Sequence, residues 1–258
     1  MKGYKMPIFA KGSLLSQEML EALKDFEVGF AKNSYTGYSD GIIAGVKVHV
    51  TQGVIYIDNG IVKYQDKIFF ISDNTKVPIS PDNKWQAVKI VFMDAENTAT
   101  FETQGMSIEV TENLEHESCK IEICRVRLQD GARLRSDYRN FEDMSTEFDT
   151  INVIDAQWAA YGKESINPLV LHEFAKEAIK YNIDNSQDIT FIHQILNNNG
   201  HAINRELIQF YLDNRIEKKN RDYDNYEIYI GLGKVLQQIK TGVVQKTETR
   251  KPRRLIVD

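Results

Sequence analysis

Apolar and polar residues alternate along residues 39 to 71, and this alternation predicts a series of short strands. In the first part of the segment every second residue is a valine, namely Val46, Val48 and Val50. A two-residue period is typical of a strand with one buried face. Further strands are predicted at residues 54 to 57, 61 to 64 and 67 to 71. The segment is therefore expected to form a small rigid β-meander.

Turn residues separate these predicted strands. Gln52-Gly53 and Gln65-Asp66 interrupt the apolar runs, and Asp58-Asn59-Gly60 stands between the second and third strands. Asn and Gly tolerate the positive φ that tight turns require, so Asp58-Asn59-Gly60 predicts a hairpin.

The strand pattern continues to residue 140. Strands are predicted at residues 85 to 92, 98 to 102, 106 to 110 and 120 to 128. In the last of these, strict alternation would place Ile121, Ile123 and Arg125 on one face. Residues 39 to 140 are thus expected to give seven or eight short antiparallel strands, arranged as a sandwich or a partly closed barrel.

Helical periods occur at both ends of the chain. Ser16 is expected to cap a short helix that carries Met19, Leu20, Leu23 and Phe26 on one face. Asn167-Pro168 predicts the start of a second helix, and Asp188 is expected to cap a third. Two more helices are predicted at residues 204 to 215 and 226 to 240. The fold class is therefore expected to be α+β.

Five regions follow from these patterns. They are an N-terminal arm and helix at residues 1 to 38, a β domain at 39 to 140, a connector at 141 to 166, a helical domain at 167 to 244 and a basic tail at 245 to 258. The connector is expected to be irregular, with Trp158 and Tyr161 as its anchors.

Composition narrows the classes of protein that fit. The chain has 258 residues, 42% of them hydrophobic, which is enough for a real core. The net charge of -5 argues against a nucleic-acid-binding protein. No apolar run is long enough to cross a membrane, and Lys11 interrupts any secretion signal, so a reducing cytoplasm is expected. Cys119 and Cys124 would lie on opposite strand faces and form neither a disulfide nor a metal site.

The sequence contains no complete motif for catalysis, a cofactor or a metal. Gly231-Leu232-Gly233-Lys234 lacks the first glycine and the final hydroxyl residue of a phosphate-binding loop, and it falls in a predicted helix. His172-Glu173 resembles the start of a zinc-protease motif, but Lys176 stands where the second histidine is needed. We therefore expect a protein that is not an enzyme and holds no cofactor or metal.

Trp158 and Tyr161 of the connector are candidates for contact with other proteins, and two further sets of residues join them. Five arginines flank the Asp130-Gly131 turn: Arg125, Arg127, Arg133, Arg135 and Arg139. They fit either a solvated charged hairpin or an interface that pairs with carboxylates of a partner. The tail supplies Arg253, Arg254, Leu255 and Ile256, a basic and then apolar stretch that could dock on a neighbouring subunit.

Two of these segments resemble the N-terminal β modules of phage and prophage tail proteins. The first match is carried by Gly60, Ile61, Val62, Tyr64, Lys67 and Ile68. The second is carried by Asp130, Gly131, Ala132, Asp137 and Arg139. The layout, with a helical part from Asn167, is similar to prophage proteins of a clostridial-type group.

The resemblance implies a structural protein of a phage tail or a tail-like bacteriocin, placed at the baseplate or at a fibre joint. It further implies an oligomer in the virion, made in the bacterial host cytoplasm, whose partners are other tail and baseplate proteins. Two other functions stay open: a host-glycan recognition module that uses exposed tyrosines, and a nucleic-acid-binding regulator that uses the basic tail.

Overall fold

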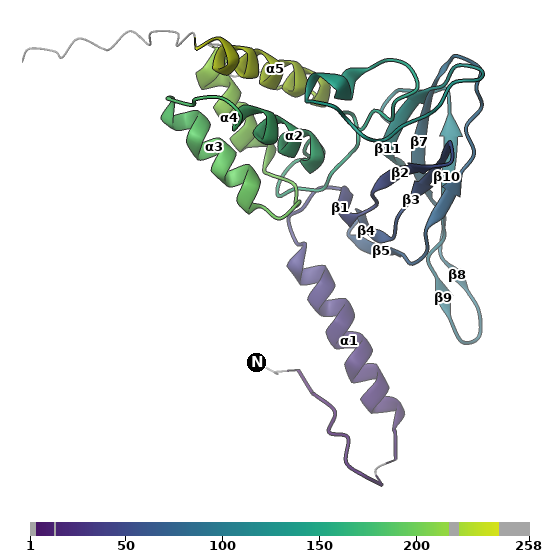
Figure 1. The fold of residues 1–258 in the computed structure, drawn as a ribbon. Coiled ribbons are helices and arrows are strands. Elements are labelled where there is room, and N and C mark those ends of the chain that lie inside the picture. Colours follow the sequence, from purple (N-terminus) through teal and green to yellow (C-terminus); the bar gives the residue numbers. More distant parts are fainter. Residues whose placement is uncertain (1–3, 13, 217–221, 243–258) are drawn as a thin grey trace, which may run out of the picture.

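The computed structural model describes residues 4–12, 14–216 and 222–242. It shows an α+β protein, as expected: a long N-terminal helix, a body of small antiparallel sheets, an irregular segment and four C-terminal helices. Figure 1 shows the C-terminal helices packed as one group beside the strands, while the N-terminal helix extends away from both. The predicted tail, with Arg253, Arg254, Leu255 and Ile256, lies outside the described residues.

The strands form three three-stranded sheets and one hairpin. The first sheet has the order β1 (Gly41–Gly45), β4 (Gly60–Tyr64), β5 (Lys67–Ile71). The second has the order β2 (Val48–Thr51), β3 (Val54–Ile57), β6 (Thr75–Val77). The third has the order β10 (Met106–Thr111), β7 (Trp85–Phe92), β11 (Lys120–Arg127). The hairpin pairs β8 (Glu96–Asn97) with β9 (Glu102–Thr103), and the described strands close no barrel.

The predicted meander was wrong, because its strands are divided between two sheets. Gln52-Gly53 and Gln65-Asp66 do form tight turns with positive φ, joining β2 to β3 and β4 to β5. Asp58-Asn59-Gly60 forms no hairpin, because β3 and β4 belong to different sheets. Gly60 is instead required by close packing, since a Cβ there would lie 2.5 Å from the backbone nitrogen of Val46. Val46 itself has a φ of 50° and lies outside β2.

Two other strand predictions were also wrong in detail. Residues 98 to 101 form the turn of the β8–β9 hairpin, where Thr98 Oγ1 accepts from the Phe101 nitrogen over 2.9 Å, so no strand spans 98 to 102. In β11, an irregularity in register between Glu122 and Cys124 breaks the strict alternation. Ile123 and Cys124 are therefore both buried although they are neighbours in sequence.

The helices begin near the predicted residues. Ser16 caps α1 (Gln17–Ser34), which continues well beyond the expected end of the apolar stripe. Asn167 caps α2 (Pro168–Ala178), and Asp224 forms a capping box with Glu227 at the start of α5 (Asn225–Thr241). The cap of α3 (Ser186–Asn197) is Asn185, so the assignment of Asp188 was wrong. The remaining helix is α4 (Arg205–Ile216).

One continuous core joins the strands to the C-terminal helices. The expected connector is irregular, apart from the short 3-10 helix η1 (Glu142–Ser145), but it is among the most buried parts of the chain. Ile151, Ile154 and Ala156 are fully buried in the same apolar cluster as residues of the sheets and of α2 to α5. The helical part is thus packed against the β part. In the described part of the chain, no helix has the length and apolar character needed to cross a membrane.

Candidate interaction surfaces

Three of the five candidate arginines are held by carboxylates of this same chain. Arg125 pairs with Glu122 and, over 2.8 Å, with Asp155. Arg127 pairs with Glu147 and covers the ring of Phe148. Arg135 donates two hydrogen bonds to the Asp143 carboxylate, over 2.6 and 2.7 Å. These pairs tie β11 and the segment after it to the irregular segment, because Asp143, Glu147 and Asp155 all lie within residues 141 to 166.

Arg133 and Arg139 are placed differently. Both are exposed, and among the described residues neither side chain forms an ion pair. The backbone nitrogen of Arg139 donates to Asp143 over 2.8 Å, which fixes the chain while leaving the guanidinium outside. Of the five candidate arginines, Arg133 and Arg139 are therefore the two whose side chains are exposed and form no ion pair within the described residues.

The two aromatic residues predicted as anchors, Trp158 and Tyr161, differ in burial. Trp158 is only 8% exposed and belongs to the core, so its ring serves the chain's own packing. Among the residues that the structure describes, its Nε1 has no hydrogen-bond partner. Tyr161 is 65% exposed and stands edge-on to Tyr38, with ring centroids 6.5 Å apart. Tyr161 therefore lies at the point where α1 joins the body.

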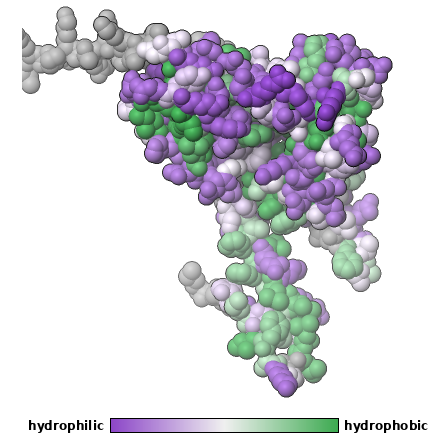
Figure 2. Space-filling view, in the orientation of Figure 1, coloured by the Kyte–Doolittle hydropathy of each residue, from purple (hydrophilic) through white to green (hydrophobic). Residues whose placement is uncertain are grey.

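Exposed apolar side chains are concentrated in the part of the chain before residue 31. Ten of the 22 exposed large apolar side chains in the described chain precede residue 31: Tyr4, Met6, Ile8, Phe9, Leu14, Leu15, Leu20, Phe26, Val28 and Phe30. They belong to the extended arm and to α1, in which no residue is buried. Figure 2 shows this apolar material over the part that extends from the body, and we call residues 4 to 34 the N-terminal projection. Leu20 and Phe26 of this surface belong to the apolar helix face that the sequence predicted.

Backbone pairing fixes the base of the projection. Ser39 and Gly162 donate backbone hydrogen bonds to Ala160 and Gly37 over 2.9 and 2.8 Å. Gly37 has a φ of 83°, and a Cβ there would lie 2.7 Å from the ring of Tyr161. The backbone that follows α1 is thus tied to the irregular segment by close, specific contacts at residues 37 to 39.

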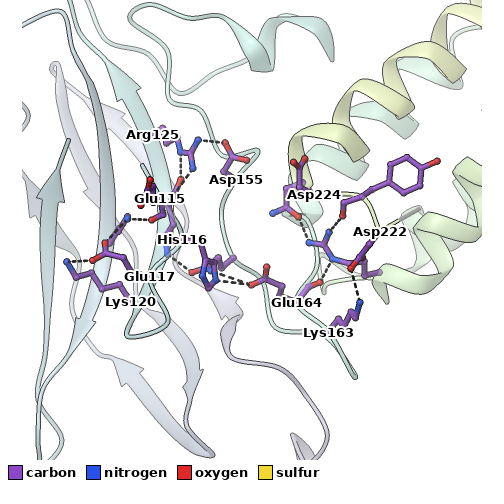
Figure 3. Close-up of a pocket in the computed structure, with 16 residues that line it drawn as sticks. Glu115, His116, Glu117, Lys120, Arg125, Asp155, Lys163, Glu164, Asp222 and Asp224 are labelled. Carbon is purple, nitrogen blue, oxygen red and sulfur yellow. Dashed lines mark hydrogen bonds and ion pairs between the residues drawn. The ribbon is translucent and has the colours of Figure 1, made fainter. Parts of the chain in front are cut away.

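A charged cleft of about 460 Å³ separates the third sheet from the helical part. Figure 3 shows its side chains pointing toward one another from three regions. The sheet supplies Lys89, Lys120, Glu122 and Arg125, the irregular segment supplies Asp155, Lys163 and Glu164, and the helical part supplies Arg205, Asp222 and Asp224. With the carboxylates of Glu115 and Glu117, acidic groups outnumber basic ones in the lining.

Each cation in this cleft already has an oxygen partner in the chain. Lys89, only 1% exposed, donates to Glu117 and to the backbone oxygen of Glu115 over 2.9 and 2.8 Å. Lys163 pairs with Asp222 over 3.2 Å. Arg205 donates to the backbone oxygens of Glu164 and Tyr223, over 2.5 and 2.6 Å. The cleft therefore acts as an internal brace between the β part and the helices, and it does not offer a free basic site for an anion.

Burial shifts the pKa values of several charged side chains that line the cleft. Desolvation raises the pKa values of the Glu122 and Asp155 carboxyls, although the nearby Arg125 opposes the shift. Desolvation lowers the pKa of Arg205, against the pull of Glu164, Asp222 and Asp224. Within the described ranges, no set of three or more His, Cys, Asp or Glu side chains could hold a metal ion.

The rejected motifs lie in ordinary helices. Gly231-Leu232-Gly233-Lys234 is in the middle of α5, where Gly231 packs closely against Leu212 of α4. His172 and Glu173 lie in α2, and Glu173 pairs with Lys176 over 3.3 Å.

A second cavity, of about 350 Å³ and mainly apolar, lies between the body and the N-terminal end of α2, and the rings of Trp158 and Tyr138 line it.

Comparison with known proteins gives structural likeness without sequence support. No family model and no curated protein matches the chain. It is similar to the crystal structure of TssK, with a TM-score of 0.46 and 12% identity over 94% of this chain and 70% of that one. It is also similar to a chain of the TssK-TssF-TssG baseplate subcomplex of the type VI secretion system, with a TM-score of 0.41 and 6% identity over 94% and 100% of the two chains. A chain of the type VI secretion system baseplate complex gives a TM-score of 0.31 and 9% identity, over 91% and 100%. Likeness at this level assigns neither a family nor a function.

Proposed function

We propose that this chain is a non-enzymatic structural component of a phage tail or phage-tail-like particle, where it links neighbouring subunits at the baseplate. One observation supports this proposal most: the N-terminal projection carries ten exposed large apolar side chains, and no residue of α1 is buried. Large contiguous apolar patches are rare on soluble monomers, and they usually mark contacts with other macromolecules.

The rest of the molecule suits a structural part of an assembly. The sheets and the C-terminal helices share one core, and ion pairs brace them across the charged cleft. The body is thus a rigid block that carries an extension at one end. The residues that resemble phage tail modules, from Gly60 to Ile68 and from Asp130 to Arg139, lie in this block.

The test uses particles purified after induction of the prophage that encodes the chain. We expect mass spectrometry to find the chain at fixed stoichiometry with the tube and baseplate proteins. A chain that lacks residues 1 to 34 is expected to stay folded, because the apolar core begins at Ile42, but to be lost from the particles. Circular dichroism and thermal unfolding of the truncated chain provide the folding control.

Two results would contradict the proposal. One is a wild-type chain that is abundant in the lysate but absent from particles. The other is a truncated chain that enters particles as well as the full chain does. Binding to a glycan array by the isolated chain would favour the glycan-recognition alternative. The expectation that deletion of residues 245 to 258 impairs assembly without unfolding the chain stays a prediction, tested in the same particles.

A further inference from the structure

We infer that the mainly apolar cavity beside α2 is a binding site for a small monocarboxylate with an apolar chain, a ligand of the fatty-acid class. The cavity has a volume of about 350 Å³ and lies between the body and the N-terminal end of α2. Ligand pockets in proteins span about 300–1,000 Å³, so this one suits a small ligand. The inference goes beyond the proposed structural role and does not depend on it.

The floor of the cavity is apolar and comes from three parts of the chain. The sheets, the irregular segment and the helical part each supply side chains that are at most 8% exposed: Ile42, Ile123, Val153, Trp158, Leu171 and Ile195. A hydrocarbon chain that lies on these side chains is removed from water, and the hydrophobic effect favours that transfer for each methylene group. The floor therefore selects an apolar body for the ligand.

The mouth of the cavity carries hydrogen-bond donors. Lys47, His172 and His201 line the cavity and are exposed, so they stand at its opening. Within residues 4–12, 14–216 and 222–242, neither Lys47 nor His201 forms an ion pair. A lysine ammonium is positively charged, and an imidazole can donate a hydrogen bond in either protonation state. The mouth thus offers positive charge and free donors.

The part of the lining that the structure describes contains no carboxylate to balance this charge. Glu173 lies 3.9 Å from Nδ1 of His172, but it pairs with Lys176 over 3.3 Å and does not line the cavity. The start of α2, at Asn167 and Pro168, also borders the cavity, and the N-terminal end of a helix dipole is positive. The electrostatics of the cavity therefore favour an anionic end on the ligand over a cationic one.

A buried donor in the wall favours a ligand that brings an acceptor oxygen. Trp158 lines the cavity, and its buried Nε1 has no acceptor among the described residues, which is unfavourable. The Tyr138 hydroxyl, by contrast, already donates to the Ile151 backbone oxygen over 2.7 Å. A carboxylate brings both negative charge and acceptor oxygens, whereas an alcohol lacks the charge and an ammonium lacks both. We therefore assign the ligand as a carboxylate.

The first experiment follows binding through Trp158 itself. The chain has two tryptophans, so Trp85→Phe leaves Trp158 as the sole indole reporter. Octanoate is titrated into this variant, and 1-octanol and octylammonium serve as ligands with the same chain and a different end group. We expect octanoate to change the Trp158 emission in a saturable way, with a dissociation constant about tenfold lower than those of the other two. Circular dichroism of the variant provides the folding control.

A second set of measurements tests the floor and the mouth separately. Each methylene group added between butanoate and octanoate should tighten binding about fourfold, because the chain lies on the apolar floor. In the same Trp85→Phe background, the double variant Lys47→Gln and His201→Gln should weaken octanoate binding about tenfold. Lys76→Gln is the matched control, since Lys76 is an exposed lysine of β6 outside the cavity, and it should leave the affinity unchanged.

Three results would overturn the inference. The first is the absence of any saturable change in Trp158 emission with octanoate. The second is equal affinity for octanoate, 1-octanol and octylammonium. The third is octanoate binding that the Lys47 and His201 substitutions weaken no more than Lys76→Gln does, which would place the ligand elsewhere, such as on the apolar N-terminal projection. A chain that gives any of these results and still enters tail particles would leave the proposed function intact.

Discussion

Asp188 and Arg215 form a buried ion pair inside the helical part, with Nε of Arg215 donating to Oδ1 of Asp188 over 2.7 Å. The hydroxyl of Tyr211 donates to the same oxygen over 2.8 Å. All three side chains are buried, and the pair joins α3 to α4 across 27 residues of sequence. Burial and the adjacent carboxylate raise the pKa of Tyr211 far above its usual range, so its hydroxyl stays a donor.

Removing the carboxylate of Asp188 should lower the free energy of unfolding substantially. Asp188→Ala leaves the guanidinium of Arg215 buried without its partner, and breaking a buried pair in this way costs about 3–5 kcal/mol. We expect a loss of this size in the free energy of unfolding, measured with urea. The control is Asp184→Ala, an exposed position just before α3, where we expect a change within about 0.5 kcal/mol. Equal effects of the two substitutions would contradict the structural role of Asp188.

The pair of Arg135 and Asp143 should give the protein an acid-sensitive contribution to stability. Hydrogen bonds from Arg135, with further donors from the Arg139 backbone and the Thr146 hydroxyl, hold the pKa of Asp143 well below its usual range. A folded-state pKa below the unfolded one stabilises the protein above the ordinary carboxyl range, and this contribution is lost as the pH falls toward the folded-state pKa.

Asp143→Asn is therefore expected to lower the free energy of unfolding by about 2 kcal/mol at neutral pH. Near a pH of about 3, the difference between wild type and variant should become smaller, because the wild type is then losing the same contribution. Urea unfolding at both pH values measures it. A difference that stays constant, or that grows at acid pH, would count against this account.

The two cysteines should differ sharply in reactivity. Cys119 is exposed, whereas Cys124 is fully buried in the core, where burial raises the pKa of its thiol far above the usual range. A thiol-reactive dye should therefore label one cysteine per native chain and two after denaturation. Cys119→Ser should abolish the native reaction. Rapid labelling of Cys124 in the native Cys119→Ser variant would show that the core around β11 opens.

A methyl group at Gly60 should strain the junction between the first two sheets. A Cβ there would lie 2.5 Å from the Val46 nitrogen and 2.6 Å from the Ala44 oxygen, both of which are backbone atoms. We expect Gly60→Ala to lower the free energy of unfolding by about 1–3 kcal/mol, the usual cost of overpacking.

Gly29→Ala is the contrasting variant, because a Cβ there meets nothing within 4 Å. It should raise the helix content of α1, measured by circular dichroism, since alanine favours helix.

The features that the sequence alone predicted correctly are local ones. Ser16, Asn167 and the Gly231 to Lys234 stretch were placed correctly because helix caps and helical apolar periods act over only a few residues. The Gln65-Asp66 turn followed from the same kind of short-range chemistry. The α+β class followed from the order of these local patterns.

Tertiary structure decided what these elements meet. The apolar spacing on α1 was visible in the sequence, but only the fold shows that no residue of this helix is buried. Asp188 looked like a helix cap because nothing local reveals Arg215, which approaches it only when α3 packs against α4. Asn59-Gly60 looked like a hairpin because a turn signal does not say which sheet the next strand joins. Short-range hydrogen bonding and periodicity are encoded within a few neighbouring residues, whereas strand partners, ion pairs and exposed faces depend on contacts between distant parts of the chain.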